Sequence, residues 1–212
     1  MADLEFYYDA GCPWAWITSR WVVDVQQARS LEVVWKPISL KKLNEHQTAD
    51  WYTPEYRSGH FAGLQVHRVA DAASAEFGND AVGRLYTATG AALHPGGRRL
   101  DVVADAQGFM AEMLGAAGLL AELAAHVDDE SHDAAIYAST EEALGRTGRD
   151  VGTPILVFHP GQSDEGSFFG PVMSMIPRGD HALRLWDAIE VIATTTGMAE
   201  LKRSLRSRPS FD

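Results

Sequence analysis

The chain has a single cysteine, Cys12, which lies directly before a proline in the stretch DAGCPWAWITSRW, residues 9 to 21. Proline is favoured at the first position of a helix, so Pro13 predicts a helix start with Cys12 at or beside the N-cap. The first-turn N–H groups and the positive end of the helix dipole would then face the sulfur. Because a thiolate is an anion, we expect this position to lower the thiol pKa and to make Cys12 a nucleophile.

A lone cysteine is also compatible with a plainer role, that of a small buried hydrophobic residue. The flanking sequence favours the nucleophile. The aromatic run LEFYYD, residues 4 to 9, is typical of a strand. A strand, a short loop and a helix beginning at Cys-Pro expose a nucleophile at the carboxyl end of a sheet. The helix itself is indicated by apolar residues at helical spacing: Trp14, Ile17, Trp21 and Val25.

The elements that position Cys12 fall into two halves. LEVVWKPI, residues 31 to 38, predicts a second strand, and a right-handed crossover would make it parallel to the first. ILVFH at 155–159 and GSFFG at 166–170 predict a hairpin because turn-forming residues separate them. An amphipathic helix over 181–195 follows. The tail after it is basic and broken by proline, and we expect it to lie on the surface or to dock loosely.

A mostly helical block separates the two halves. After a polar loop, Pro54 predicts the start of one helix, and Asn79 or Asp80 is expected to cap another. Asp101 is expected to cap a third, whose apolar stripe runs as far as Ala117. These stripes are more typical of core packing than of a cofactor site.

The order β-α-β, helical block, β-β-α resembles a thioredoxin fold, and the long block resembles the arrangement in DsbA-like proteins. We therefore expect an α/β chain with a thioredoxin-like domain formed by residues 1–40 and 150–212 and an inserted helical domain at 41–149. GTPI, residues 152 to 155, lies just before the third strand. Thioredoxin folds carry a cis-proline there that faces the cysteine, so the resemblance implies a cis Thr153–Pro154 bond.

The order of several motifs is more specific. Five motifs in this order are together similar to the actinobacterial DsbA-like oxidoreductases described as mycothiol-dependent nitroreductases. The motifs are CPWAWITSRW, SLKKLNE, VGTP, FFGPVMSMIPRG and a terminal Pro-x-Phe-Asp. The resemblance runs almost from end to end. It implies a low-molecular-weight thiol cofactor, mycothiol or glutathione, and substrates such as mixed disulfides or nitro compounds. Kappa-class glutathione transferases, hydroxychromene-carboxylate isomerases and polyketide-biosynthesis DsbA-like proteins share the architecture.

One position departs from the usual Cys-x-x-Cys redox motif, because its fourth residue is Ala15. In a dithiol enzyme the second thiol attacks the mixed disulfide and closes the cycle, and alanine cannot do this. We therefore predict a monothiol cycle in which an external thiol releases Cys12. The same alanine keeps two alternatives open. One is a transferase-like or isomerase-like enzyme that activates the thiol of a bound cofactor, and the other is a non-catalytic protein that binds thiol ligands.

Several residues are candidates for the site beside Cys12. Pro13 would fix the helix start, and Trp14 would form an aromatic wall beside the sulfur or pack in the core. The backbone of Thr153 could pair with a thiol cofactor or a peptide as an added strand does. Pro154 would lie against the sulfur.

Three further candidates lie outside the segments that carry Cys12 and Pro154. Asn44 and Tyr56 flank the entrance to the helical block, where a polar and an amphipathic side chain suit a small-molecule pocket; a loop hydrogen bond or a surface ring is the alternative. Arg178 is expected either to meet a carboxylate of the cofactor or to cap a helix. The resemblance also favours a homodimer.

Composition excludes several classes of function. The net charge of -11 argues against nucleic-acid binding, which needs a basic face. A single cysteine excludes an intrachain disulfide, and the spacing of His60 and His67 does not suit a shared zinc ion, so no metal is expected. No apolar run approaches the roughly 18 residues of a membrane span, and no secretory signal is visible. A cytoplasmic location, whose reducing conditions keep Cys12 free, is therefore expected.

Overall fold

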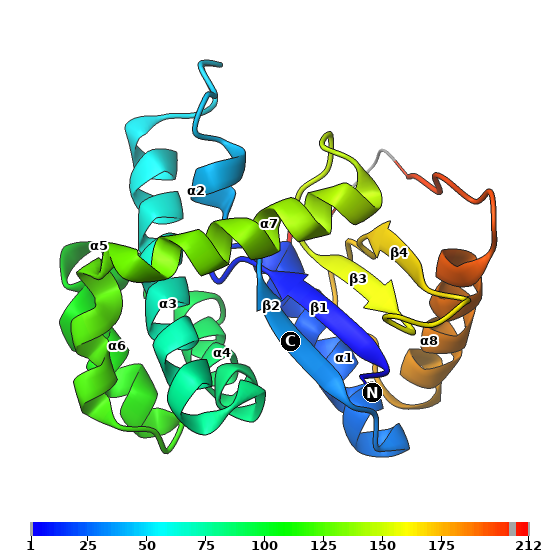
Figure 1. Cartoon of the computed structure of the whole chain (residues 1–212), viewed down its shortest axis with the longest axis horizontal. Coiled ribbons are helices and arrows are strands. Elements are labelled where there is room, and N and C mark those ends of the chain that lie inside the picture. The colour runs from blue at the N-terminus through cyan, green and yellow to red at the C-terminus, as the bar shows by residue number, and fades with distance from the viewer. Residues whose placement is uncertain (1, 204–206, 212) are drawn as a thin grey trace.

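A four-stranded sheet forms the centre of the fold, and the computed structural model describes residues 2–203 and 207–211. The strand order is β2-β1-β3-β4. β1 (Leu4–Tyr8) pairs in parallel with β2 (Val33–Pro37) and antiparallel with β3 (Ile155–Phe158), which pairs antiparallel with β4 (Gly166–Phe169). The predicted parallel crossover and the predicted hairpin are both confirmed. Residues distant in sequence, from the two ends of the chain, therefore meet on adjacent central strands (Figure 1).

Helices cover both faces of this sheet. In Figure 1, α1 (Pro13–Arg29) and α8 (Gly179–Thr194) lie behind the strands and α7 (Asp133–Thr147) crosses in front of them. α1 and α8 are joined by a hydrogen bond that the buried Trp21 indole Nε1 donates to the Ala182 carbonyl over 2.9 Å. The Trp21 ring also packs on that of Trp186, with their centroids 5.6 Å apart. This contact fixes the orientation of α1, whose first turn carries Cys12.

The helical block lies between β2 and β3 in the sequence and beside the sheet in space, on the left of Figure 1. It begins with a single helical turn where a polar loop was expected, because the Ser39 hydroxyl caps that turn by accepting a hydrogen bond from the Lys42 N–H over 3.3 Å. Its elements before α7 are α2 (Leu40–Leu43), α3 (Pro54–Phe77), α4 (Asn79–Leu93), α5 (Arg99–Ala104), α6 (Ala106–Ala116) and the 3-10 helices η1 (Ala121–Asp128) and η2 (Glu130–His132).

The predicted cap of α4 is wrong. Gly78 holds the cap position, and the Asn79 side chain instead pairs with the backbone of Trp35 in β2. Asn79 accepts from the Trp35 N–H over 2.8 Å and donates to the Trp35 carbonyl over 2.8 Å. β2 is an edge strand, so its outer backbone groups need partners, and an amide side chain supplies both a donor and an acceptor.

The single helix expected from Asp101 is divided into α5 and α6. The chain is extended at Asp105, with φ −149° and ψ 83°, and the Asp105 carboxylate caps α6 by accepting from the Gly108 N–H over 2.8 Å. An aspartate side chain competes with the backbone for helical hydrogen bonds, which explains why the helix restarts there. The apolar stripe from Val102 to Ala117 is therefore shared by two helices.

The hydrophobic core runs from the sheet into the helical block without interruption. Tyr8 of β1 stacks on Tyr86 of α4 with ring centroids 3.8 Å apart, and Trp35 of β2 packs edge-on to Tyr86 at 5.9 Å. At Gly90 the α4 backbone approaches the Trp16 ring so closely that a Cβ would lie 2.2 Å from Trp16 Cε3. The block is thus anchored on the helix and strands that carry Cys12, and the predicted domain limits stay a prediction.

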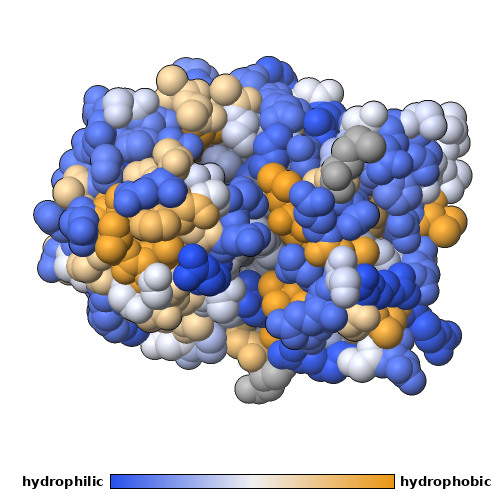
Figure 2. Space-filling view, turned by 60° about the horizontal axis from the view of Figure 1, so that its bottom comes forward, coloured by the Kyte–Doolittle hydropathy of each residue, from blue (hydrophilic) through white to orange (hydrophobic). Residues whose placement is uncertain are grey.

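The surface in Figure 2 shows apolar patches broken up by hydrophilic residues. The most exposed large apolar side chains are scattered over different elements; they are Leu100, Met175, Val191 and Leu201. Within residues 2–203 and 207–211, no helix is both long enough and apolar enough to cross a membrane.

Candidate active site

Cys12 is the N-cap residue of α1, as predicted. Its backbone is extended, with φ −85° and ψ 114°, and Pro13 is the first helical residue. The Ala15 N–H donates a hydrogen bond to Cys12 Sγ over 3.5 Å, so a helix N-terminus does point at the sulfur. The loop from β1 is closed by a hydrogen bond from the Cys12 N–H to the Asp9 carbonyl over 3.0 Å.

The segment before β3 lies against the same sulfur. Cys12 Sγ donates a hydrogen bond to the Thr153 carbonyl over 3.5 Å, and the Thr153–Pro154 peptide bond is cis. Thr153 Oγ1 donates to the Tyr7 carbonyl over 3.3 Å, which holds this segment beside β1. The fold therefore brings Cys12, Pro13, Thr153 and Pro154 together from opposite ends of the chain.

The expected lowering of the Cys12 pKa is wrong. Burial raises the pKa of the Cys12 thiol to about 11, because the side chain is almost fully withdrawn from water and its charged form is desolvated. The hydrogen bond from the Ala15 N–H acts in the opposite direction and is outweighed, and the nearby Asp9 charge raises the pKa further. In this state Cys12 is a neutral thiol at neutral pH.

A buried carboxyl group, Asp9, lies behind the cysteine, and the sequence analysis did not single it out. Its oxygens accept hydrogen bonds from the Gly11 N–H and the Leu40 N–H, each over 2.8 Å. Burial raises the pKa of Asp9 to about 6. His67 Nε2 lies 3.9 Å from Asp9 Oδ2, and burial lowers the pKa of His67 to about 3, so this histidine is neutral. An acidic residue ending a strand of aromatic side chains, directly before the cysteine loop, was the available signal.

The helical block also holds the loop that carries Cys12. His94 at the end of α4 has its Nε2 3.0 Å from the Ala10 carbonyl, and Arg99 of α5 donates to the Gly11 carbonyl. Burial lowers the pKa of His94 to about 3, so its neutral ring donates this hydrogen bond. Phe211 packs against the His94 ring with centroids 5.9 Å apart. The end of the tail therefore docks, whereas residues 204–206 and 212 lie outside the described residues.

The remaining predicted site residues occupy separate positions. Trp14 is half-buried and packs against the core, and Asn44 ends α2, where its amide donates to the Leu40 carbonyl over 2.9 Å. Tyr56 on α3 is 54% exposed. Arg178 precedes α8 and forms an ion pair with Asp24 at 2.5 Å. The assignment of these four side chains to cofactor or substrate binding stays a prediction.

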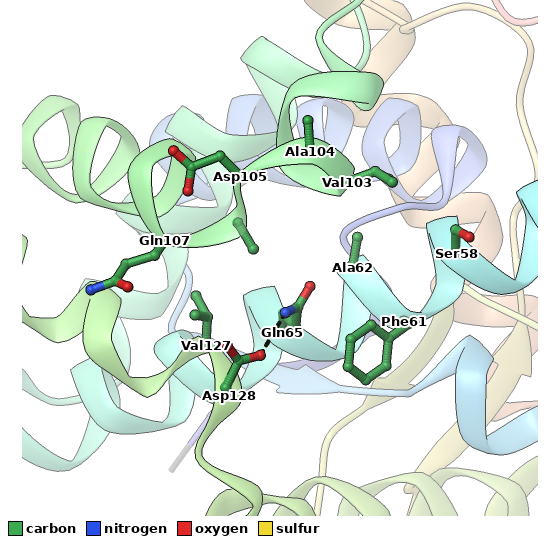
Figure 3. Close-up of a pocket in the computed structure, with 11 residues that line it drawn as sticks. Ser58, Phe61, Ala62, Gln65, Val103, Ala104, Asp105, Gln107, Val127 and Asp128 are labelled. Carbon is green, nitrogen blue, oxygen red and sulfur yellow. Dashed lines mark hydrogen bonds between the residues drawn. The ribbon is translucent and has the colours of Figure 1, made fainter.

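Among the cavities formed by the described residues, a larger and a smaller one lie elsewhere on the surface. The larger, about 430 Å³, lies between α3, the α5–α6 junction and η1, and Figure 3 shows Phe61, Gln65 and Asp128 among its lining. Gln65 Nε2 donates to Asp128 Oδ1 over 2.8 Å at its edge. The smaller, about 280 Å³, is lined by residues 173–177 with His181 and Leu185. Neither lining includes Cys12 or Thr153, so these cavities do not define the site.

A cysteine at a helix N-terminus opposite the residue before a cis-proline is the geometry that the resemblance implied. The family model described as Rv2466c-like, mycothiol-dependent nitroreductase Rv2466c, matches residues 11–203. The chain belongs to this family. The Rv2466c-like family assignment confirms the predicted relationship and places the chain among thiol-dependent oxidoreductases.

Individual relatives agree with the Rv2466c-like assignment. The chain is 29% identical over 203 residues to the uncharacterized protein Rv2286c of Mycobacterium tuberculosis (strain ATCC 25618 / H37Rv), with 96% of this chain and 82% of that protein covered. It superimposes on the cytosolic disulfide reductase DsbM from Pseudomonas aeruginosa with a TM-score of 0.59, 16% identity, and coverage of 89% and 98% of the two chains. This similarity confirms the predicted DsbA-like thioredoxin fold with its large helical insertion.

Proposed function

We propose that the chain is a monothiol oxidoreductase that uses a low-molecular-weight thiol, with Cys12 as the residue that exchanges disulfides. The observation that carries this proposal is the placement of Cys12 Sγ between the first turn of α1 and the Thr153 carbonyl, 3.5 Å from each partner atom. Membership of the mycothiol-dependent family supports mycothiol as the thiol, with glutathione as the alternative.

The proposed cycle consists of two exchanges. The Cys12 thiol gives up its proton, and the resulting thiolate attacks one sulfur of a mixed disulfide. A new S–S bond forms to Cys12, the old S–S bond breaks, and the leaving thiolate takes up a proton. A free thiol, as its thiolate, then attacks the sulfur bound to Cys12, which releases Cys12 and leaves a new disulfide in solution. Ala15 supplies no sulfur for this second step, so it must come from the external thiol.

Reduction of a nitro compound needs an external source of electrons. Two thiols that join as one disulfide supply two electrons and two protons, which balance the conversion of a nitro group to a nitroso group and water. We propose that the nitro group takes the two electrons and two protons when the Cys12 thiol and one cofactor thiol join as a mixed disulfide, and that the second thiol then releases Cys12 by disulfide exchange. Trp14, Asn44, Tyr56 and Arg178 are the proposed contacts for the thiol cofactor or the substrate.

The structure also favours a second candidate, a transferase-like or isomerase-like reaction. A thiol whose pKa is raised to about 11 remains protonated and can donate a hydrogen bond to the thiolate of a bound cofactor. In that reaction Cys12 orients the cofactor and forms no covalent bond, which also explains why Ala15 is tolerated. A protein that only binds thiol ligands would use the same backbone edge at Thr153.

Substitution of Cys12 separates these functions. Wild type, Cys12→Ser and Cys12→Ala are exposed to oxidised mycothiol and to oxidised glutathione. Intact mass is measured together with disulfide exchange, nitro reduction and addition of the reduced thiol to an electrophile. The oxidoreductase predicts one adduct in wild type and no activity in either variant. A transferase would keep activity in Cys12→Ser, because the hydroxyl still donates, and lose it in Cys12→Ala. Absence of an adduct with both disulfides would overturn the oxidoreductase proposal.

We also propose a location and an assembly state for the chain. A free thiol suits the reducing cytoplasm, and the DsbM neighbour is described as cytosolic. A homodimer, with small-molecule thiols and disulfides or electrophiles as partners, remains the proposal taken from the family resemblance.

A further inference from the structure

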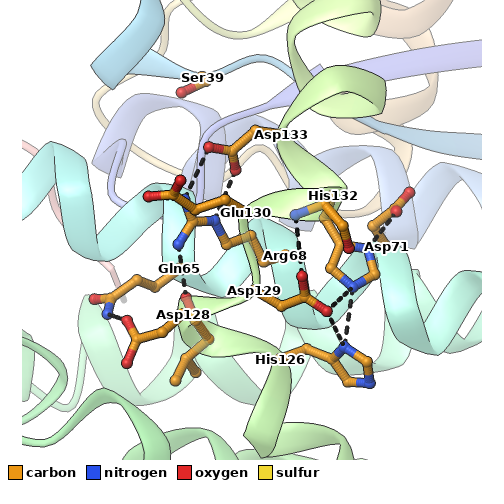
Figure 4. A network of polar contacts seen from close by, with 12 residues as sticks. Ser39, Gln65, Arg68, Asp71, His126, Asp128, Asp129, Glu130, His132 and Asp133 are labelled. Carbon is orange, nitrogen blue, oxygen red and sulfur yellow. Dashed lines mark hydrogen bonds and ion pairs between the residues drawn. The ribbon is translucent and has the colours of Figure 1, made fainter.

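Three side chains direct ligand atoms toward one point at the junction of η1 and η2 (Figure 4). His126 Nδ1 lies 3.0 Å from His132 Nε2 and 3.3 Å from Asp129 Oδ2, and His132 Nε2 lies 3.7 Å from Asp129 Oδ2. We propose that His126, Asp129 and His132 bind a divalent metal ion of the Zn²⁺ class. This site is independent of the Cys12 chemistry.

The separations of these atoms suit zinc. Histidine nitrogen and carboxylate oxygen bind zinc at about 2.0–2.2 Å, and tetrahedral geometry then sets neighbouring ligand atoms about 3.3–3.5 Å apart. The three observed separations, from 3.0 to 3.7 Å, bracket that range. Three protein ligands leave a fourth tetrahedral position for water or another small ligand.

Asp71 on α3 orients one of the histidines. Its Oδ2 lies 2.8 Å from His132 Nδ1, a distance at which the carboxylate accepts a hydrogen bond from an Nδ1–H. In the tautomer that carries its proton on Nδ1, the Nε2 lone pair faces His126 and Asp129. A carboxylate that fixes the tautomer of a ligating histidine is a recurring feature of zinc sites.

The carboxylate of Asp129 is oriented by the backbone of η2. Asp129 Oδ1 accepts a hydrogen bond from the Ser131 N–H over 3.0 Å, which directs Oδ2 toward the two histidines.

The site is open to solvent, and no lysine or arginine among the described residues forms an ion pair with its carboxylates. The side chains of His126 and Asp129 are 37% and 41% exposed, whereas that of His132 is 15% exposed. The nearby guanidinium of Arg68 is already bound to both oxygens of Asp133, at 2.7 and 2.8 Å. Two carboxylates, Asp71 and Asp129, therefore remain to balance a divalent ion.

The ligands come from two 3-10 helices and from the residue that separates them. His126 lies in η1 and His132 in η2, and Asp129 between them is extended, with φ −81° and ψ 98°. An ion bound here would join η1 to η2 and, through Asp71, to α3, so we expect it to stabilise the helical block.

Metal titration of the full-length protein tests the site. The Cys12→Ser background removes the single thiol, and the chelator-treated protein is titrated with Zn²⁺ by calorimetry and with Co²⁺ by absorption. We expect one ion per chain, a higher Tm with Zn²⁺, and a cobalt spectrum of nitrogen and oxygen ligands. His126→Ala and His132→Ala should each weaken binding by about 100-fold or more, and Asp71→Asn by about 10–100-fold.

Two control variants separate loss of the metal site from misfolding and from binding to other histidines. Asp129→Asn keeps an oxygen to accept from the Ser131 N–H but loses the charged ligand, so it should fold normally and bind weakly. His46→Ala removes a histidine whose side chain is 92% exposed and lies outside the cluster, and it should bind as the parent does. Absence of any Zn²⁺-dependent heat or Tm change in the parent would overturn the site, and so would unchanged affinity in both His126→Ala and His132→Ala. In that case the His126–His132 contact is a hydrogen bond between the two rings.

Discussion

The thiol of Cys12 donates a hydrogen bond to the carbonyl oxygen of Thr153, a residue 141 positions later in the chain. A carbonyl accepts only from the protonated thiol, so this contact and burial both favour the neutral form of Cys12. The first turn of α1 favours the thiolate through the Ala15 N–H. The reactivity of Cys12 therefore depends on which of these partners an incoming ligand displaces.

Alkylation of Cys12 should be slow at neutral pH. Burial raises its thiol pKa to about 11, so we expect the rate with iodoacetamide to keep rising above pH 9 in the native protein. Unfolding in urea should return the thiol to a pKa of about 8.5 and speed the reaction at neutral pH. Asp9→Asn should react faster than wild type, because the Asp9 charge contributes to the raised pKa. A native rate that levels off near neutral pH would contradict the prediction.

The free energy of unfolding should depend on Asp9 between about pH 4 and pH 7. Its pKa is raised from 3.8 to about 6, so the native state holds a proton that the unfolded state has lost. The higher pKa of Asp9 in the native state contributes stability that is fully present below about pH 4 and is lost as the pH rises through about 6. Relative to wild type, Asp9→Asn should therefore gain up to about 3 kcal/mol between these limits.

Urea denaturation of both proteins across that range measures this gain. Burial lowers the pKa values of His67 and His94 to about 3. These histidines destabilise the native state as the pH falls, because they must accept protons in a buried position, so their effect on the free energy of unfolding is opposite to that of Asp9. They are common to both proteins, so the difference isolates Asp9. A difference that does not vary with pH would show that the Asp9 carboxyl titrates normally.

Ala15→Cys should convert the monothiol site into a dithiol site. The Ala15 N–H already contacts Cys12 Sγ, so a thiol at position 15 would lie on the first turn beside the nucleophile. After exposure to oxidised glutathione we expect an internal disulfide and no lasting adduct, whereas wild type keeps one glutathione. Intact mass before and after reduction distinguishes the two products, and Ala15→Ser controls for the added side-chain volume. A stable adduct on Ala15→Cys would contradict the prediction.

Gly90→Ala should destabilise the protein. A Cβ at this position would lie 2.2 Å from Trp16 Cε3, so the ring or the helix must move, at a cost of about 1–3 kcal/mol. Gly145→Ala is the matched control, because Gly145 lies in an exposed position of α7 with no heavy atom within 4 Å of its added Cβ. It should gain about 0.5–1 kcal/mol from helix propensity. Chemical denaturation of the two variants gives the comparison, and equal stability would show that Trp16 yields freely.

Signals between near neighbours in the sequence were sufficient for much of the fold. These signals depend on contacts within a few residues: Cys-Pro at a helix start, aromatic and β-branched runs bounded by turn residues, and apolar stripes at helical spacing. They are sufficient to predict β1, α1, β2 and the β3–β4 hairpin. The same kind of signal was insufficient at Asn79 and Asp105. Their side chains can cap a helix, pair with an edge strand or interrupt a helix, and the neighbouring elements select among these roles.

The chemistry at Cys12 required the tertiary structure. The sequence by itself determined that the only cysteine stands at the start of a helix and that no second cysteine follows it. Thr153 and the helical block pack over Cys12 and bury it. Only this tertiary packing makes the desolvation of the thiolate larger than the stabilisation by the helix N-terminus, so that the thiol pKa is raised. Tertiary packing also brings Asp71 of α3 beside the cluster formed by His126, Asp129 and His132. Capping is a local interaction, whereas desolvation and convergence of ligands depend on residues that are distant along the chain.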